Sequence, residues 1–389
     1  MEIFRRTFAE INLENLQHNY MQIKTIAGDH RFVCPMVKAN AYGHGDIQVA
    51  RHLENLGATH LGVCLIEEGT LLRSQHIKSE ILVFRGFDKE GAQKIFDAQL
   101  TPVVSTWDQI KFLESVVDDY IKVHLKFDTG MNRLGFSFSE TEKLRDYFKK
   151  SKKLKLKAIL SHLFNADDAI DENGYSSKQA AEMIQIYHFF KSDGVYVHFL
   201  NSGGIASFAS AEVQNNKSHY LKKENWGFRP GLMLYGYAPD SKFRHLNLKP
   251  VMTFKSVVNN IRVVPKNQTV SYGASWKAQR DSVIAVVPVG YADGVHRLLS
   301  NTGQVLFAGH LVPIIGRICM DFLMLDVTDW VKPEHIHLYN EEEVILFGYD
   351  KNQNFLSAEV NAQAMQSITW EILTAVGERV PRHFKGVIA

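Results

Sequence analysis

Reactive side chains and glycines directly follow short apolar runs at five places in the first 240 residues. A lysine that ends an apolar run is partly desolvated, which favours the neutral amine needed to form a Schiff base. An arginine in such a position can bind a carboxylate or phosphate through two parallel N–H hydrogen bonds. Glycines beside a serine let backbone N–H groups approach a phosphate closely. The five segments are VKANAYGHG (37–45), KFDTGMNRLGF (126–136), SHLFNADD (161–168), LNSGG (200–204) and FRPG (228–231).

Each of these residues also has an ordinary structural interpretation when it is taken alone. Lys38 could be a surface lysine with a buried aliphatic stem, and Arg133 and Arg229 could form structural ion pairs. His162 could be a hydrogen-bonded structural histidine, and LNSGG could be a tight turn. The combination of all five segments favours a functional site.

The spacing of the apolar runs predicts where these segments lie in a fold. Strand-like runs start about 20 to 40 residues apart, and helical apolar periodicity lies between them, as in repeated βα units. Eight such runs predict a (β/α)8 barrel of the α/β class, whose chemistry sits at the carboxyl ends of the strands. A helix is expected from Asn12, as N-cap, to Ala27, with Gly28 ending it. The runs are FVCPMV, HLGVCLI, ILVF, TPVVS, IKVHLKF, LKAILSH, VYVHFLN and FRPGLMLYG.

The pattern changes after about residue 240, where strands follow one another with only turn residues between them. We therefore expect residues 1–240 to form the barrel and residues 241–389 a mostly antiparallel β domain, with residues 1–12 as candidates to pair with the latter. Near the end, Ser357 is expected to cap one helix that runs to Val376. Three motifs in this domain combine glycines with tyrosine or aspartate: SYGASW (271–276), VGYADG (289–294) and GRICMD (316–321).

Composition narrows the class of partner. The 44 Lys and Arg residues nearly balance the 42 Asp and Glu residues, and a net charge of +2 argues against nucleic acid and favours a small molecule. Cys34, Cys64 and Cys319 show no metal-ligand spacing, so we interpret them as reduced structural thiols and expect no metal. The absence of a signal-like N-terminus and of an 18-residue apolar run favours a cytoplasmic protein without a membrane partner.

Taken together and in this order, the segments resemble the alanine racemase family, the fold type III group of pyridoxal 5′-phosphate (PLP) enzymes. The resemblance covers nearly the whole chain. It implies that Lys38 carries PLP, that Tyr42 contacts the cofactor's phosphate, and that Arg133 binds substrate and cofactor. It also implies that Tyr272, in SYGASW, is a second catalytic base.

The resemblance further implies a cofactor pocket in which Ser202 and the backbone of Gly231 and Leu232 hold the phosphate. Arg229 would face the pyridine nitrogen. Two residues depart from the family's usual pattern: Trp370 replaces a frequent phosphate-binding tyrosine, and Asn132 replaces a common glycine before the arginine. An indole N–H can donate a hydrogen bond but cannot accept one. The remaining cofactor residues that we expect are His162 and Asn201.

The family architecture implies a head-to-tail homodimer in which the β domain of one chain covers the barrel mouth of the other. Tyr272, Tyr291, Met320 and Asp321 would then serve the partner's site, with Tyr291 and Met320 near the substrate. Lys126 matches a position that is often a carbamylated lysine. A carbamate there would hold the guanidinium of Arg133.

The implied activity is the interconversion of L-alanine and D-alanine, which supplies D-alanine for peptidoglycan. Lys38 would act on D-alanine and Tyr272 on L-alanine. The alternatives are a racemase of broader specificity, a fold type III PLP amino acid decarboxylase, and a noncatalytic PLP carrier. Arg229 counts against a decarboxylase, for which an acidic pyridine partner is expected. The SYG motif counts against a carrier, which needs no opposing base.

Overall fold

The protein is described by a computed structural model that covers residues 5–168, 170–216 and 219–386. The chain forms two compact units, which are described separately below. The barrel unit consists of residues 16–41 and 46–249. The β unit consists of the chain up to residue 15, residues 42–45 and the chain from residue 250 onward.

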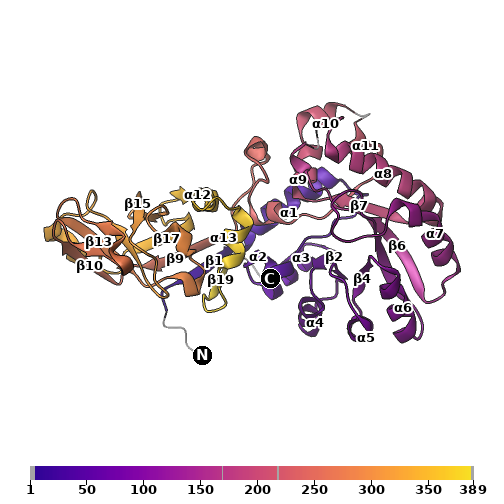
Figure 1. Cartoon of the computed structure of the whole chain (residues 1–389), viewed down its shortest axis with the longest axis horizontal. Coiled ribbons are helices and arrows are strands. Elements are labelled where there is room, and N and C mark those ends of the chain that lie inside the picture. Colours follow the sequence, from indigo (N-terminus) through magenta and orange to yellow (C-terminus); the bar gives the residue numbers. More distant parts are fainter. Residues whose placement is uncertain (1–4, 169, 217–218, 387–389) are drawn as a thin grey trace. The chain divides into compact units, whose positions relative to one another are not determined.

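The barrel unit is built on parallel strands in sequence order (Figure 1). The residues before Lys38 close the ring, because Val33 pairs with Phe228 and Met36 pairs with Gly62, both in parallel. These eight segments confirm the predicted (β/α)8 barrel. The named strands are β2 (His60–Val63), β3 (Glu80–Val83), β4 (Thr101–Val104), β5 (Ile121–Lys126), β6 (Leu154–Leu160), β7 (Tyr196–Leu200) and β8 (Gly227–Phe228).

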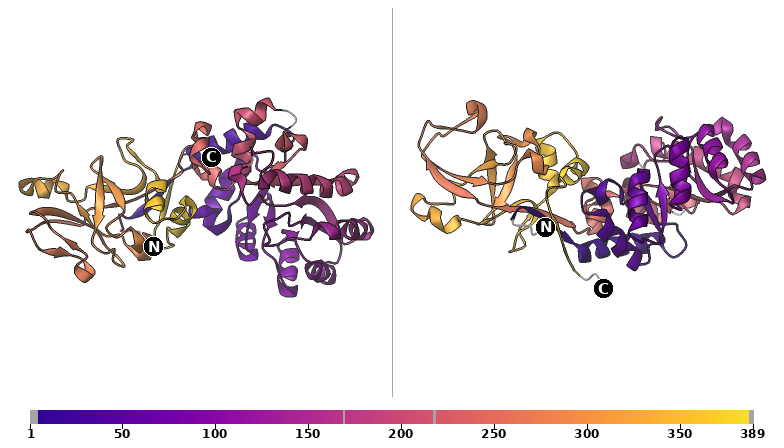
Figure 2. Two further views of the ribbon diagram at one scale, coloured as in Figure 1. Left: turned by 45° about the horizontal axis from the view of Figure 1, so that its top comes forward. Right: turned by 90° about the horizontal axis from the view of Figure 1, so that it is seen from below.

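Helices lie on the outside of this ring of strands, as the two further views in Figure 2 show. The predicted cap of α1 (Leu13–Ala27) is confirmed, since Asn12 Oδ1 accepts hydrogen bonds from the N–H groups of Glu14 and Asn15, and Gly28 follows with φ 68°. No helix in the described ranges is long and apolar enough to span a bilayer. The other helices are α2 (Lys38–Tyr42), α3 (Asp46–Asn55), α4 (Ile66–Ser74), α5 (Lys89–Asp97), α6 (Trp107–Val116), α7 (Thr141–Lys150), α8 (Tyr175–Phe190), α9 (Ser202–Phe208), α10 (Ala211–Asn215) and α11 (Tyr220–Lys223).

The β unit contains a large, mostly antiparallel sheet in the order β10-β13-β16-β15-β14-β17-β9-β1-β19. The first strand of the chain, β1 (Phe8–Asn12), lies in this sheet, antiparallel to β9 and parallel to β19. The other strands are β9 (Met252–Val257), β10 (Asn260–Val264), β13 (Ser282–Val287), β14 (Gln304–Phe307), β15 (His310–Ile315), β16 (Leu323–Asp326), β17 (Glu343–Tyr349), β18 (Phe355–Leu356), β19 (Arg382–Lys385) and the short pair β11 (Thr269–Val270) and β12 (Trp276–Lys277).

The single C-terminal helix predicted from Ser357 to Val376 is wrong. Ser357 does cap a helix, but the chain forms α12 (Ala358–Ala364) and α13 (Thr369–Ala375) with a turn between them. Gln366 takes a left-handed φ of 55°, and the N–H of Ser367 donates to Ala362 O. Ile368, which directly precedes α13, is 58% exposed.

We predict that Gly348→Ala destabilises the β unit much more than Gly309→Ala. Both glycines have a left-handed φ, of 105° and 82°. A Cβ at Gly348 would lie 2.6 Å from the Cα of Thr253, whereas one at Gly309 meets only the side-chain amide of Asn354 at 3.2 Å. The expected costs are about 3 kcal/mol and about 1 kcal/mol. Equal thermal midpoints for the two variants would contradict the described backbone contact.

Candidate active site

The chain turns sharply behind Lys38, which directly follows the segment that closes the barrel. Ala39, Asn40 and Ala41 have left-handed φ values of 52°, 53° and 51°. Such a conformation costs roughly 1–2 kcal/mol for each L-residue. The carboxylate of Glu68 accepts a hydrogen bond from Ala39 N at 2.6 Å and others from the backbone N–H groups that precede α4. Glu68 therefore ties the Lys38 turn to the loop after β2.

Lys126 ends β5 in a buried position that collects positive charge. Burial lowers its pKa to about 8, and the charges of Arg133 and Arg229 act in the same direction while Asp128 opposes them. Lys126 and Arg133 form no ion pair with any carboxylate in the described parts of the chain. The site therefore holds a readily deprotonated amine and an exposed guanidinium with capacity for an anion.

The loop after β5 is organised by the carboxylate of Asp128. Its oxygens accept hydrogen bonds from the backbone N–H groups of Gly130, Asn132 and Arg133 at 2.9 to 3.0 Å. Asn132 has a left-handed φ of 55°, a conformation that glycine adopts readily and asparagine tolerates. The departure at Asn132 is thus compatible with the turn that precedes Arg133.

Arg229 carries a full charge in a buried position with neutral acceptors around it. Its Nη1 donates to His198 O at 2.5 Å and to His198 Nδ1 at 2.9 Å, and its Nη2 donates to Ser161 O at 2.6 Å. Burial lowers its pKa to about 10. In the described residues no carboxylate pairs with it and no acceptor faces its Nε–H. The structural ion pair considered for Arg229 is therefore not found there.

His162 lies beside Arg229, with Nδ1 3.3 Å from Nη2. Its pKa is well below the usual value because of burial and the nearby charges of Arg229, Arg133 and Lys126. His162 is therefore neutral at physiological pH. Lys38 contributes to the same positive field, so the structure brings four cationic side chains and one neutral imidazole together at the carboxyl ends of the strands.

Ser202 begins α9 and is tied to the turn after β8. Its Oγ accepts hydrogen bonds from the N–H groups of Gly231 and Met233 at 3.0 and 3.4 Å, which leaves its O–H able to donate. Leu232 opens the short 3₁₀ helix Leu232–Tyr235. Asn201 caps α9 by accepting from Gly204 N. The hydroxyl of Ser202 is therefore available to donate a hydrogen bond to a phosphate.

Packing is a second explanation for the glycines of LNSGG, and sequence reasoning missed it. A Cβ at Gly203 would lie 2.4 Å from the Cβ of Ala166, and one at Gly204 would lie 2.7 Å from Leu163 Cδ1. Gly203 is thus required for packing against the neighbouring βα loop, whereas the close contact at Gly204 is with the end of a flexible leucine side chain. The hydroxyl of Ser202 remains available to a ligand.

In the β unit, the residues that follow Lys38 in sequence pack against α13. Tyr42 is buried, and a Cβ at Gly43, whose φ is 83°, would lie 2.3 Å from Leu373 O. Arg382 Nε also donates to Gly43 O at 3.0 Å. Trp370 is half-buried on the same helix. The segment with Tyr42 and the helix with Trp370 therefore form one packed group.

Three loops of the β unit are hydrogen-bonded to one another and present exposed apolar side chains. Ser271 Oγ donates to Arg317 O at 2.5 Å, and the N–H of Tyr291 donates to Cys319 O at 3.0 Å. We call these loops the aromatic loops; they comprise residues 271–275, 290–294 and 316–322. The exposed side chains on them are Tyr272 at 69%, Met320 at 52%, Tyr291 at 44% and Phe322 at 41%.

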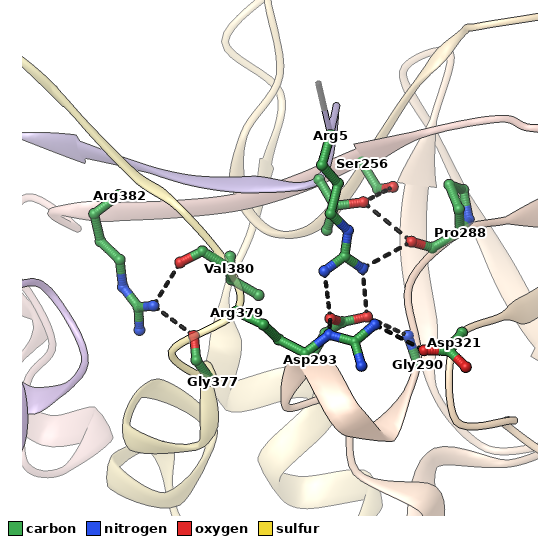
Figure 3. A network of polar contacts seen from close by, with 11 residues as sticks. Arg5, Ser256, Pro288, Gly290, Asp293, Asp321, Gly377, Arg379, Val380 and Arg382 are labelled. Atoms are coloured by element: carbon green, nitrogen blue, oxygen red, sulfur yellow. Dashed lines mark hydrogen bonds and ion pairs between the residues drawn. The ribbon is translucent and has the colours of Figure 1, made fainter. Parts of the chain in front are cut away.

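A buried carboxylate holds two of the aromatic loops in place (Figure 3). Asp293 is fully buried and accepts two hydrogen bonds of 2.6 Å from the guanidinium of Arg5, and one from Gly290 N. Arg379 contacts the same carboxylate at 2.9 Å and also bonds Asp321 at 2.7 Å. Asp321 is thus engaged within its own chain by Arg379, a partner that sequence reasoning did not identify.

The parallel barrel has a lysine after its first strand and cations at its strand ends, and an antiparallel domain follows it. Together these features define the class of fold type III PLP-dependent enzymes. Residues 11–239 match the family model described as "Alanine racemase, N-terminal domain", and residues 251–384 match "Alanine racemase, C-terminal domain". The chain belongs to the alanine racemase family. This assignment confirms the predicted family, its isomerase activity and its PLP dependence.

Individual relatives agree over the full length. The chain is 36% identical to an alanine racemase of Sorangium cellulosum, covering 98% of this chain and 99% of that one. It is 33% identical to "Alanine racemase 2" of Caldanaerobacter subterraneus, covering 97% and 94%. The solved alanine racemase of Streptomyces lavendulae superposes with a TM-score of 0.88 at 26% identity, covering 100% and 99%. That of Bartonella henselae, described with covalently bound pyridoxal phosphate, gives 0.84 at 29%, covering 98% and 99%.

We predict that Asp293→Asn destabilises the β unit by about 2 kcal/mol, because the change removes the counter-charge of Arg5 at a buried site, whereas Arg379 keeps its contact with Asp321. The matched control is Asp329→Asn, which removes an exposed ion pair with Arg280 and should not measurably change stability. Urea unfolding of both variants, followed by tryptophan fluorescence, measures the difference. If Asp293→Asn is as stable as the control, the carboxylate does not organise these loops.

Proposed function

We propose that this chain racemises alanine with two bases that belong to different subunits, Lys38 of one and Tyr272 of the other. The observation that carries the proposal is the group formed by Lys38, Arg133 and Arg229 beside the readily deprotonated Lys126 at the carboxyl ends of the barrel strands, none of which is ion-paired within the described residues. A site of this charge suits ligands with several anionic groups, such as a phosphate, a phenolate and a substrate carboxylate.

The barrel residues fit PLP in three respects. Lys38 offers an amine at the end of a strand, Ser202 offers a hydroxyl donor for a phosphate, and Arg229 has an unused Nε–H. PLP, when bound, supplies the electron withdrawal that acidifies the Cα–H of the amino acid. Because arginine only donates hydrogen bonds, Arg229 would favour an unprotonated pyridine nitrogen and so a weaker electron sink.

In the proposed mechanism, Lys38 Nζ holds or removes the Cα proton on one face of the substrate, and Tyr272 Oη does so on the other. Lys38 would serve D-alanine and Tyr272 would serve L-alanine. Arg133 would bind the substrate carboxylate, with Tyr291 and Met320 limiting the space around the substrate. Neutral His162 contacts Arg229 and would hold that guanidinium in place.

The assembly that we propose is a homodimer with shared sites, supported by the aromatic loops. Exposed apolar side chains grouped on interlinked loops are typical of a surface that another protein covers. Hydrogen bonds within each chain already fix these loops, so a partner would meet a preformed surface. We propose the barrel mouth of a second copy as that partner. The proposed location is the cytoplasm, whose reducing conditions suit the three free cysteines.

Incubation of the PLP-loaded protein with L-alanine in D₂O tests the proposed function directly. We expect D-alanine with deuterium at Cα, seen by chiral separation and mass analysis, because each base exchanges its proton with solvent. Tyr272→Phe should abolish this product, whereas Tyr339→Phe, a matched change outside the aromatic loops, should not. Unlabelled L-alanine as the only product from the unsubstituted protein would overturn the proposal.

Arg229→Glu should raise the ratio of transamination to racemisation. A glutamate would favour a protonated pyridine nitrogen and therefore a stronger electron sink, and pyruvate release reports the side reaction. Arg229→Lys is the control, since it keeps a donor with positive charge and should lose racemase activity without a rise in pyruvate. An unchanged ratio in Arg229→Glu would show that the contact does not limit the side reaction.

We predict that Lys126 carries a carbamate. A buried lysine with a pKa of about 8 is largely neutral in mildly alkaline solution, so its nitrogen can bond to the carbon of CO₂ with release of a proton. Uptake of ¹³C from labelled bicarbonate should therefore rise with pH and level off above about 8. Lys126→Ala should abolish it, and Lys122→Ala, on the same strand, should not. Absence of the ¹³C carbamate signal at pH 9 in the unsubstituted protein would refute the prediction.

A further inference from the structure

A chain of hydrogen bonds crosses the interior of the barrel from Arg229 to Tyr196. Arg229 Nη1 lies 2.9 Å from His198 Nδ1, and His198 Nε2 lies 2.9 Å from His124 Nδ1. His124 Nε2 lies 3.1 Å from the hydroxyl oxygen of Tyr196. The chain therefore connects the strand ends that form the candidate active site with the first residue of β7.

The direction of every hydrogen bond in this chain follows from Arg229. A guanidinium can only donate, so His198 Nδ1 must accept. His198 and His124 are neutral, since burial and Arg229 hold the pKa of His198 well below the usual value, and burial lowers the pKa of His124 to about 3. Each imidazole then donates its single N–H onward, and the oxygen of Tyr196 accepts the last one.

The hydroxyl proton of Tyr196 remains at the end of the chain. Burial raises the pKa of Tyr196, so the hydroxyl stays protonated and is a donor. No acceptor for this O–H is found among the residues that the structure describes. The ordered chain of donors therefore ends with a donor at the opposite end of β7 from Ser202.

Tyr196 lines a cavity of about 580 Å³ at the amino ends of the barrel strands. This volume is within the range of sites that hold small molecules. Phe32 and His60, whose rings lie 4.7 Å apart, also line it, and Phe32 packs on Tyr196 at 4.9 Å. The cavity thus has aromatic rings beside the unused hydroxyl.

The charged residues that line the cavity favour an anion. Glu80 is engaged by Lys122 at 2.8 Å and by the hydroxyl of Thr101 at 2.9 Å. Lys24, Arg31 and Lys157 also line the cavity and form no ion pair in the described parts of the chain, and Asp29 is the other lining carboxylate. Cations are therefore in excess among the charged residues that line the cavity.

We propose that this cavity binds a small oxyanion, a carboxylate or a phosphate, which accepts a hydrogen bond from Tyr196 Oη. Such an anion would end the chain of donors with an acceptor and would offset part of the uncompensated charge of Arg229. The site lies at the opposite end of the strands from the candidate active site. Binding at this site does not require racemisation, although the chain of hydrogen bonds connects the site to Arg229.

The binding test uses the PLP-loaded protein at constant ionic strength in chloride. One arm titrates inorganic phosphate and follows its ³¹P relaxation; the other titrates benzoate and follows saturation transfer to its ring protons. We expect saturable binding of at least one probe, and the probe that binds identifies a phosphate or a carboxylate ligand. Tyr196→Phe should weaken it about tenfold, since one hydrogen bond to a charged group is lost.

Two lysines of β6 give a matched pair of charge variants. Lys157→Gln removes a cation that lines the cavity and should weaken binding severalfold, whereas Lys155→Gln, two residues away and outside the cavity lining, should leave it unchanged. The ring ¹⁵N signals of His124 should shift on titration in the unsubstituted protein. The proposal would be overturned, even if the protein racemises alanine, by lack of saturable binding of both probes. It would also be overturned if Tyr196→Phe and Lys157→Gln each bound the probe as tightly as the unsubstituted protein.

Discussion

The buried guanidinium of Arg229 is the constraint on which much of the barrel unit depends. Its described acceptors are backbone carbonyls and neutral imidazoles, and it fixes the proton positions of His198 and then of His124. The same uncompensated charge helps to lower the pKa of Lys126 and of His162, which favours their neutral forms. A site with this much unpaired positive charge is stabilised by anionic ligands, which is the property that a PLP-dependent racemase requires.

The β unit has a different constraint: its exposed aromatic side chains lie on loops whose conformation must be fixed by other contacts. Asp293 is the counterpart of Arg229 there, a buried charge that is paired by Arg5 and Arg379. Its hydrogen bonds fix the loop of Tyr291, and further bonds join that loop to the one that carries Met320. The proposed second base therefore belongs to a surface that is organised before any partner arrives.

Sequence reasoning located the barrel and its polar strand ends because apolar runs followed by reactive residues are local patterns. It could not identify Glu68, whose position in the first turn of α4 looks like ordinary helix capping. It also missed the buried imidazoles, since His124 and His198 lie within runs that otherwise indicate apolar strands. The break near Gln366 is made by a left-handed residue and local backbone hydrogen bonds that end α12, which helical periodicity alone does not report.

The central claim, that each active site takes Lys38 from one chain and Tyr272 from another, is tested most directly by subunit complementation. Lys38→Ala and Tyr272→Phe are each expected to be nearly inactive. When they are mixed, dissociated and reassociated, half of the dimers combine both variants, and each such dimer regains one intact site. The account predicts recovery of about a quarter of the unsubstituted activity. A mixture that stays as inactive as its components would contradict it, because that result places both bases in the same chain.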